Sequence, residues 1–248
     1  MDLKIKNKVA LITGASSGIG ASTAKVLAQE GADVILTFKN NLKGAKETEK
    51  MVNALGRNSW LYRFDMSNPK SVSFTINQLK KKFEQIDILV LCAGEISIVP
   101  FEKLEPKEWN AIINVNLNGT FFVLHSLIPL MANESSIVIV SSVSAHTGSP
   151  NQAHYAAAKA GLINLTKSAS RALAPRIRVN CVAPGITLTS MGRKTIASLE
   201  RNYRSEKLLV RNYASSEEIA QLITYVVSPI SRFMTGATID INGGRILR

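Results

Sequence analysis

Short apolar runs alternate with amphipathic stretches along the whole chain. The apolar runs are rich in β-branched residues and are predicted to be buried strands at 9–13, 34–38, 88–93, 137–140, 179–182 and 238–241, with a further strand just before Asp65. The stretches between them have helical periodicity. Continuous apolar strands need cover on both faces, which is typical of right-handed βαβ units. We therefore expect an α/β fold of the doubly wound Rossmann type, with one parallel sheet of about seven strands and helices on both faces.

No linker, internal repeat or low-complexity tract interrupts this alternation, so the 248 residues are predicted to form a single domain. The dinucleotide-binding part is expected at about residues 1–140 and the catalytic and substrate-binding part at about 141–248. Irregular segments at 94–105, 144–151 and 184–211 follow the fourth, fifth and sixth predicted strands. Because ligands of open α/β sheets bind at the carboxyl ends of strands, these segments are expected to line the substrate pocket.

A glycine-rich turn follows the first predicted strand and leads into a predicted helix at 19–30. The turn reads TGASSGIG at 13–20, with GxxxGxG spacing. Glycines permit a tight turn and a close approach to a pyrophosphate, while the helix N-terminus presents free N–H groups. The context favours dinucleotide binding over an ordinary glycine-rich turn. The predicted contacts are Gly14, Ser16, Ser17, Gly18, Ile19 and Gly20.

The end of the second predicted strand favours NADP(H) as cofactor. An acidic side chain there would bind the ribose of NAD and repel a 2′-phosphate, but this chain has Phe38 followed by Lys39. Lys39 as a solvated loop lysine, and NAD(H) as the cofactor, remain alternatives. Asp65, after the third strand, is placed to accept a hydrogen bond from the adenine amino group. The alternative is a helix-capping role for the Asp-Met-Ser-Asn-Pro stretch at 65–69.

Tyr155 and Lys159 stand four residues apart on a predicted helix at 152–173, so their side chains share one face. At about 5 Å and an effective dielectric of ~20, the cation favours the phenolate by roughly 3 kcal/mol, or about two pKa units. Together with the positive charge of an oxidised nicotinamide, this would let the phenol act as a general acid or base near neutral pH. The YxxxK spacing is common in helices and needs support from other residues.

That support comes from two other positions. Ser142, at the end of the fifth predicted strand, is placed to polarise a substrate carbonyl; Ser141 and Ser144 are rival candidates, and a structural serine is the alternative. Asn116 falls within a long helical pattern at 106–131, where asparagine is a poor helix former. It is consistent with a kink that holds a water for proton relay.

Composition narrows the function classes. The net charge of +12 comes from scattered residues, with one run of three lysines at 80–82 and no aromatic residues interleaved with a basic cluster, so nucleic-acid binding is disfavoured. No apolar run approaches the ~18 residues of a membrane span, and the N-terminus lacks a signal-peptide pattern. Cys92 and Cys181 fall in strand-like segments as small buried thiols. We expect a cytoplasmic protein with no membrane partner and no metal site.

Taken together, these motifs show that the chain resembles the short-chain dehydrogenase/reductases over nearly its whole length. The matches are TGASSGIG at 13–20, Asp65, Asn116, Ser142, Tyr155, Lys159, Pro184, Gly185, Thr189, TGAT at 235–238 and NGG at 242–244. The segment QAHYAAAKAG at 152–161 is especially similar to bacterial 3-oxoacyl-carrier-protein reductases.

The resemblance implies roles for the matched residues. Tyr155 would protonate a carbonyl oxygen that Ser142 binds. Lys159 would hold the nicotinamide ribose and lower the pKa of Tyr155, while Asn116 would support the relay. Further implied cofactor contacts are Phe38, Lys39, Asp65, Met66, Ala93, Gly94, Tyr155, Lys159, Pro184, Gly185, Thr187 and Thr189. The chain departs from the family where Asn-Asn-Ala-Gly is replaced by LCAG at 91–94, and where Ser17 replaces the arginine of many carrier-protein reductases.

The function implied is NADP(H)-dependent reduction of a 3-oxoacyl thioester. A dehydrogenase for a sugar, steroid or small secondary alcohol is the alternative, and a non-catalytic dinucleotide-binding or RNA-associated protein is a third. The expected pocket residues are mostly apolar, which disfavours sugars. They are Ile96, Ile98, His146, His154, Ile186, Leu188 and Met191.

Two kinds of partner are considered. Acyl carrier protein is one, although residues 131–134 carry no basic side chain; Arg171 and Arg176 are expected in the following helix. A second copy of the chain is the other. The helical patterns at 106–131 and 152–173 are apolar over more surface than one sheet face covers, and the family commonly pairs these helices, so a homotetramer is expected and a dimer next.

Overall fold

The computed structural model describes residues 2–247 and contains one sheet of seven parallel strands, in the order β3-β2-β1-β4-β5-β6-β7. The predicted α/β class is confirmed. The strands are β1 (Val9–Ile12), β2 (Asp33–Phe38), β3 (Ser59–Arg63), β4 (Ile86–Leu91), β5 (Met131–Val140), β6 (Ile177–Pro184) and β7 (Thr238–Ile241).

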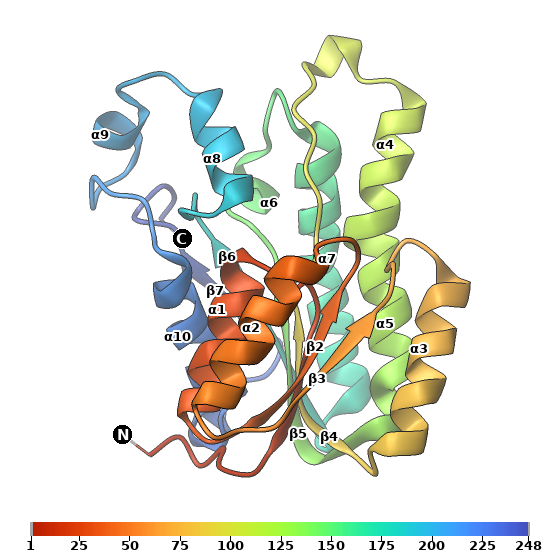
Figure 1. The fold of residues 1–248 in the computed structure, drawn as a ribbon. Coiled ribbons are helices and arrows are strands. Elements are labelled where there is room, and N and C mark those ends of the chain that lie inside the picture. The colour runs from red at the N-terminus through yellow and green to blue at the C-terminus, as the bar shows by residue number, and fades with distance from the viewer. Residues whose placement is uncertain (1, 248) are drawn as a thin grey trace.

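Helices cover both faces of the sheet, with α1, α2 and α10 on one side and α3, α4, α5 and α7 on the other (Figure 1). They are α1 (Gly18–Gln29), α2 (Leu42–Ala54), α3 (Pro69–Lys82), α4 (Pro106–Ile113), α5 (Gly119–Leu127), α6 (Ser144–Thr147), α7 (Ala153–Leu173), α8 (Ser190–Ala197), α9 (Tyr203–Lys207) and α10 (Ser216–Val227). The 3₁₀ turns are η1 (Phe101–Lys103), η3 (Ile128–Leu130) and η4 (Pro229–Ser231), and η2 (Asn114–Asn118) is a π-helical turn.

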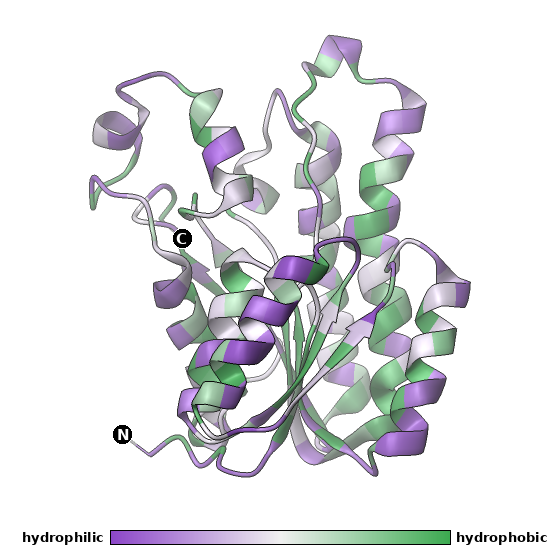
Figure 2. Cartoon of the chain, viewed as in Figure 1, coloured by the Kyte–Doolittle hydropathy of each residue, from purple (hydrophilic) through white to green (hydrophobic). Residues whose placement is uncertain are grey.

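The continuous apolar strands supply two cores at once, because successive side chains of a strand point to opposite faces. On β4, Leu89 and Leu91 enter the core beneath α3, α5 and α7, whereas Ile88 and Val90 enter the core beneath α1, α2 and α10. Figure 2 shows the strands as an apolar band between helices whose outer surfaces are hydrophilic. This two-sided burial explains why the strands could be predicted from uninterrupted apolar runs.

Two boundaries differ from the sequence expectation. Strand β5 begins at Met131, six residues before the predicted apolar run, because Met131 pairs with Ile86 across an irregularity in the β4–β5 register. The helical pattern expected to continue to 131 ends earlier. Pro129, which lacks an N–H donor, lies in the 3₁₀ turn that follows α5.

The helical segment Pro106–Leu130 is long and apolar enough, by length and composition, to cross a membrane, with a mean hydropathy of 1.4 over an 18-residue window. This mean hydropathy is reached with polar residues inside the segment, among them Asn114, Asn116 and Asn118, rather than by an uninterrupted apolar run. The inward face of the segment, including Val123, Leu124 and Leu127, packs in the core under the sheet. We therefore describe it as a core helix of the α/β fold, for which such hydropathy is common.

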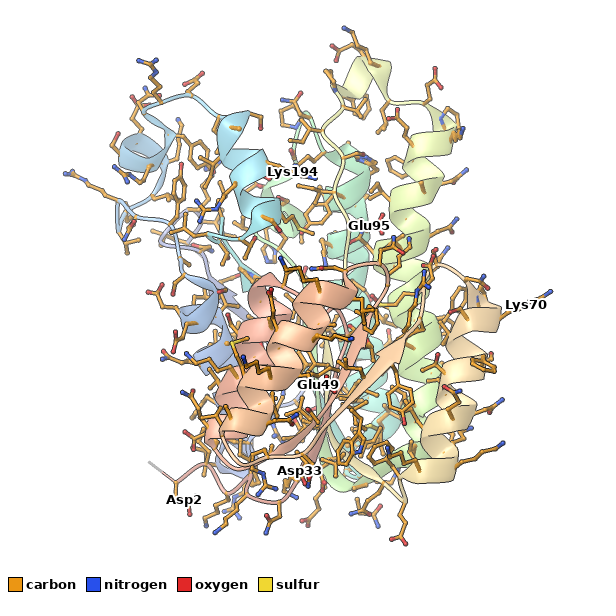
Figure 3. The ribbon with its side chains drawn as sticks, viewed as in Figure 1. Asp2, Asp33, Glu49, Lys70, Glu95 and Lys194 are labelled. Atoms are coloured by element: carbon orange, nitrogen blue, oxygen red, sulfur yellow. The ribbon has the colours of Figure 1, made fainter. Side chains whose placement is uncertain are left out.

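Parallel strands place all their carboxyl ends at one edge of the sheet. Figure 3 labels Glu95, which follows β4, at this edge, whereas Asp33, the first residue of β2, lies at the opposite edge. Most of the predicted cofactor contacts and Ser142 follow strand ends, so the topology gathers them at one edge, whereas Tyr155 and Lys159 lie on α7 and Asn116 in the turn between α4 and α5.

Candidate active site

A groove of about 340 Å³ runs along the carboxyl ends of β1, β2, β3 and β4. The predicted cofactor contacts that line it are Gly14, Ser16, Ser17, Gly18, Ile19, Gly20, Phe38, Lys39, Asp65, Met66, Ala93, Gly94 and Thr189. A second cavity of about 120 Å³ adjoins it, and Ile19, Cys92, Gly94, Thr189 and Met191 line both. Ser142, Tyr155, Lys159, Pro184, Gly185 and Thr187 line this second cavity. The fold therefore brings the predicted cofactor and catalytic residues together, except Asn116, which lies behind the groove wall.

The glycine-rich turn fits a dinucleotide pyrophosphate. Gly14 has a φ of +71°, and a Cβ there would lie 2.8 Å from Cα of Ala93, so only glycine fits. Helix α1 begins at Gly18 without a side-chain cap from Ser17 and without an acidic residue in its first turn. The N–H donors and positive dipole end of α1 are thus directed at the groove with no protein carboxylate of their own, which is the arrangement that binds phosphates.

The ends of β1 and β4 are joined by one hydroxyl. Thr13 Oγ1 accepts hydrogen bonds from the backbone N–H groups of Cys92, at 2.9 Å, and Ala93, at 3.0 Å. These bonds use backbone donors, so they form whichever side chain stands at position 92. This part of the cofactor edge is therefore held despite the departure from Asn-Asn-Ala-Gly.

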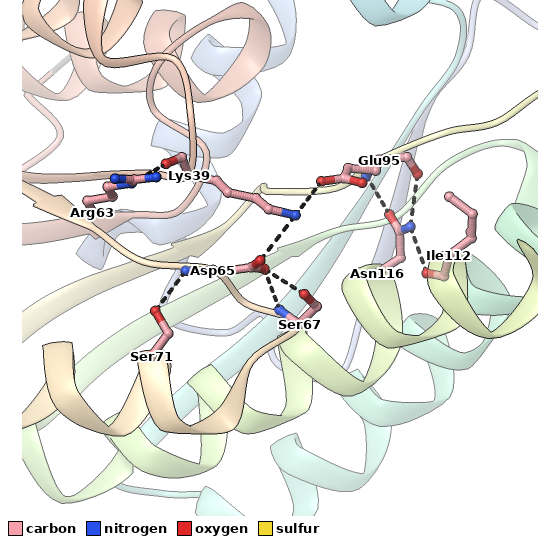
Figure 4. A network of polar contacts seen from close by, with 8 residues as sticks. All are labelled: Lys39, Arg63, Asp65, Ser67, Ser71, Glu95, Ile112 and Asn116. Atoms are coloured by element: carbon pink, nitrogen blue, oxygen red, sulfur yellow. Dashed lines mark hydrogen bonds and ion pairs between the residues drawn. The ribbon is translucent and has the colours of Figure 1, made fainter. Parts of the chain in front are cut away.

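Lys39 lies between two carboxylates in the groove (Figure 4). Its ammonium is 3.2 Å from Asp65 Oδ2 and 3.1 Å from Glu95 Oε1. Desolvation opposes the charge of Lys39, but the hydrogen bonds and charges of Glu95 and Asp65 outweigh it and raise the pKa of Lys39. Desolvation likewise opposes the charge of Asp65, yet hydrogen bonds from Ser67 and the contact with Lys39 lower its pKa. Lys39 thus lines the groove as an ion-paired residue whose side chain remains 39% exposed.

Asp65 does not cap the next helix. Its Oδ1 accepts hydrogen bonds from the backbone N–H and the hydroxyl of Ser67, and the cap of α3 is Asn68. The capping role considered for the stretch at 65–69 is therefore correct for Asn68, whereas the side chain of Asp65 itself does not form the cap.

Asn116 lies in the π-helical turn Asn114–Asn118 between α4 and α5, where a helix irregularity was predicted. The residue is fully buried. Its Nδ2 donates to the carbonyls of Ile112 and Glu95, both at 2.9 Å, and its Oδ1 accepts from the Glu95 N–H at 3.3 Å. The side-chain amide therefore fixes the segment after β4 against the helix. This positioning contact could not be recognised from the sequence.

Tyr155 and Lys159 share a face of α7, as their spacing predicted. Lys159 is buried, its Nζ lies 5.5 Å from the centre of the Tyr155 ring, and it donates to the Val140 carbonyl at 2.9 Å. Among the rival serines, Ser141 is buried and donates to the Lys159 carbonyl at 2.8 Å, which is a structural contact. Ser142 hydrogen-bonds with Tyr155. The geometry therefore favours Ser142 over Ser141.

Burial changes the acid–base chemistry of this pair. Desolvation raises the pKa of Tyr155 to about 12, against a smaller opposing effect of the Ser142 hydrogen bond. Desolvation also lowers the pKa of Lys159 to about 8. Loss of hydration is thus the largest influence on the pKa of Tyr155, and the expected lowering of that pKa by Lys159 and a bound nicotinamide stays a prediction.

The expected pocket residues are only partly correct. Ile96, Ile186 and Met191 line the second cavity. The other four lie elsewhere: Ile98 and Leu188 are exposed, His154 is buried with Nε2 2.5 Å from Ser97 Oγ, and His146 Nε2 lies 3.2 Å from Asp240 Oδ1. Both histidines contact other residues of the fold instead of the pocket. The apolar character of a residue did not by itself reveal which side chains face the pocket. Lining residues that the sequence interpretation missed include Cys92, Val143 and Gln152, whereas Glu95 and Thr195 lie in the segments 94–105 and 184–211 that were expected to line the pocket.

Cys92 could have been recognised as a pocket-lining residue from its position at a strand end, where ligands bind. Instead it was interpreted as a small buried thiol, as was Cys181. Both are free thiols; Cys181 is buried, whereas Cys92 is partly exposed and lines both cavities.

Comparisons with known proteins agree with this site. A family described as Enoyl-(Acyl carrier protein) reductase matches residues 14–245. The chain is 37% identical to a 3-oxoacyl-[acyl-carrier-protein] reductase of Thermotoga maritima, covering 99% of this chain and 100% of the relative. It is 32% identical to the reductase of the same name from Aquifex aeolicus, covering 98% and 99%.

Solved structures give the same family. A short-chain dehydrogenase from Burkholderia cenocepacia in complex with NADP has a TM-score of 0.89 at 32% identity, over 99% of both chains. A Brucella melitensis protein titled short-chain dehydrogenase/reductase, glucose/ribitol dehydrogenase, has a TM-score of 0.92 at 30% identity, over 100% of both chains. These matches span the glycine-rich turn, the groove and the Ser142, Tyr155 and Lys159 cluster. The chain is therefore a member of the short-chain dehydrogenase/reductase family, an oxidoreductase with a groove for a nicotinamide dinucleotide.

Proposed function

We propose that this protein reduces a 3-oxoacyl thioester to the 3-hydroxyacyl thioester, with NADPH as hydride donor. The observation that carries the proposal is the cluster of Ser142, Tyr155 and Lys159 in the second cavity, adjoining the dinucleotide groove. The names of the curated relatives supply the substrate class. The partly apolar cavity lining, with Ile96, Ile186 and Met191, is consistent with an acyl chain.

A reduced nicotinamide bound in the groove supplies the hydride. Ser142 donates a hydrogen bond to the substrate carbonyl oxygen, and the hydroxyl of Tyr155 donates the proton that this oxygen takes up. A Tyr155 pKa of about 12 keeps the phenol protonated at neutral pH, which suits the reductive direction. The nearby ammonium of Lys159 stabilises the phenolate left behind, and its pKa of about 8 lets it return a proton near neutral pH.

The preference for NADP(H) rests on the end of β2. Phe38 occupies the position where an acidic residue would bind the ribose of NAD, and Lys39 lines the same groove as a cation for a 2′-phosphate. Asp65 is the proposed partner of the adenine amino group. We expect NADPH to bind at least about tenfold more tightly than NADH, and equal dissociation constants for the two would contradict this preference.

A substrate panel followed by NADPH absorbance tests the reaction. It contains a 3-oxoacyl thioester, an enoyl thioester, a sugar, a steroid ketone and a small ketone. We expect the highest kcat/KM with the 3-oxoacyl thioester, by about tenfold or more. A sugar, steroid or small ketone turned over equally well would favour the alternative dehydrogenase function, and preference for the enoyl thioester would exclude carbonyl reduction as the main activity.

Further expectations belong to the same proposal. An acyl carrier protein would deliver the substrate, and the exposed Arg171 on α7 is one cation available to it. Arg176, also expected in that helix, lies beyond its end and donates to the Met131 carbonyl at 3.0 Å, so it is less available.

We also infer a single functional domain over the whole chain, divided near residue 140, and a cytoplasmic location.

Nucleic-acid binding is the alternative that the charge of +12 suggests. A salt titration of binding to RNA and DNA separates the two functions. Weak, generic binding is expected, whereas tight binding with sequence preference and a steep salt dependence would favour an RNA-associated role.

A further inference from the structure

An ion pair crosses the dinucleotide groove between segments that are far apart in the sequence. Lys39 follows β2 and Glu95 follows β4, and β1 lies between these two strands in the sheet. The contact of 3.1 Å between the two side chains therefore passes over the carboxyl end of β1, and both residues line the groove (Figure 4). A cofactor that enters the groove meets this pair at the end where Lys39 would bind a 2′-phosphate.

The backbones of the pair are held while the side chains keep freedom to move. Asn116 bonds both the N–H and the carbonyl of Glu95, and the Arg63 side chain donates to the Lys39 carbonyl at 2.9 Å. The side chains of Lys39 and Glu95 are 39% and 50% exposed, so both can rotate without disturbing the core. A bound ligand can thus replace the Glu95 carboxylate as partner of Lys39 with little structural cost.

The charges around Lys39 make this replacement unfavourable for an anion. One ammonium faces two carboxylates, Asp65 and Glu95, so these three side chains together carry one net negative charge, and the Arg63 guanidinium at the Lys39 carbonyl adds a positive charge beside them. A 2′-phosphate adds nearly two more negative charges, whereas the ribose hydroxyl of NAD(H) adds none. Asp65 is anchored by Ser67 and remains at the end of β3, which leaves Glu95 as the carboxylate that can move away.

From this geometry we propose that Glu95 is a specificity-determining residue, whose carboxylate competes with the 2′-phosphate of NADP(H) for Lys39 and so weakens the preference for NADP(H). The proposal rests on the proposed function in taking Lys39 as the 2′-phosphate contact. An ion pair between half-exposed side chains is weak, so the expected effect is a change of about three- to tenfold in the dissociation constant of NADPH.

The test is the pair of dissociation constants for NADPH and NADH, measured by titration of the full chain without substrate. Glu95→Gln is expected to lower the dissociation constant of NADPH about three- to tenfold and to change that of NADH by less than about twofold. Glu84→Gln is the matched control, because Glu84 is exposed and precedes β4 at the opposite edge of the sheet. It changes the net charge equally and should leave the ratio of the two constants unaltered. An unchanged ratio in Glu95→Gln would overturn the proposal.

A double-mutant cycle shows whether Glu95 acts through Lys39. In a Lys39→Ala background, Glu95→Gln should lose most of its effect on NADPH binding. If Glu95→Gln strengthened NADPH binding equally in the Lys39→Ala background, Glu95 would act by repelling the phosphate directly. That result would overturn the proposed competition for Lys39. The cycle also separates this inference from the proposed cofactor preference. A wild type that binds both cofactors equally contradicts that preference, yet a Glu95→Gln variant that then favours NADPH, through Lys39, still supports the role of Glu95.

Discussion

The ammonium of Lys159 lies 5.5 Å from the centre of the Tyr155 ring and donates a hydrogen bond to the Val140 carbonyl. The first contact follows from the four-residue spacing on α7, and the second ties that helix to the end of β5. Ser142 follows β5 by two residues, so one lysine fixes the tyrosine relative to the serine. The catalytic proposal depends on this three-way placement.

Tyr155→Phe is expected to abolish nearly all turnover and to change the dissociation constant of NADPH by only a few-fold, because the lost hydroxyl would contact substrate rather than the phosphates. Steady-state rates and a cofactor titration measure the two effects. Tyr225→Phe, at an exposed site on α10, is the control and should behave as wild type. Substantial turnover by Tyr155→Phe would show that another group is the acid.

The neighbouring serines should separate chemistry from stability. Ser142→Ala is expected to lower kcat about 100-fold or more, because it removes a donor to the carbonyl oxygen, with little change in the free energy of unfolding. Ser141→Ala should instead cost about 1 to 2 kcal/mol of stability, because the buried hydrogen bond from the Ser141 hydroxyl to the Lys159 carbonyl is lost. Kinetics and urea unfolding distinguish the two variants. If Ser141→Ala lost turnover and Ser142→Ala lost stability, the roles of the two serines would be exchanged.

Lys159→Ala should impair both turnover and cofactor binding, because one ammonium is proposed to hold the ribose and to stabilise the Tyr155 phenolate. Its pH–rate profile should also shift relative to wild type. Loss of turnover with unchanged NADPH affinity and an unchanged profile would contradict this double role.

Lys159 also predicts a pH dependence of stability. Its pKa is lowered from 10.5 to about 8 in the folded chain, so between those values the unfolded chain binds a proton that the folded chain has released. The lowered pKa of Lys159 therefore reduces the free energy of unfolding below about pH 8, and this penalty disappears as the pH rises above 8. Relative to Lys159→Met, wild type should gain on the order of 2 kcal/mol of unfolding free energy between pH 7.5 and 10. If urea unfolding gave the same pH dependence for wild type and Lys159→Met, the lowered pKa of Lys159 would be contradicted.

Assembly is the final prediction, with a homotetramer expected at micromolar concentration and a dimer next. Phe121 on α5 is exposed beside Phe122 and His125 on the helix expected to pair between subunits. Phe121→Glu should shift the protein to smaller species in sedimentation velocity. Phe74→Glu, at an exposed position of α3, should not. A monomeric wild type would refute the assembly.

The sequence determined the features that depend on local spacing. Apolar runs buried on both faces predicted the parallel sheet, the glycines at 14, 18 and 20 predicted a phosphate turn, and the spacing of Tyr155 and Lys159 predicted a shared helix face. Asn116 marked the helix irregularity, because asparagine is a poor helix former. Each of these signals arises within a few residues of chain.

The tertiary structure decided what depends on burial and on segments distant in the sequence. Glu95 reaches Lys39 only because β4 and β2 flank β1. His154 hydrogen-bonds with Ser97 and does not line the pocket. The sign of the Tyr155 pKa shift also required the structure. The cation four residues away is visible in the sequence, but the loss of hydration that raises the pKa of Tyr155 depends on how the surrounding chain packs around the phenol.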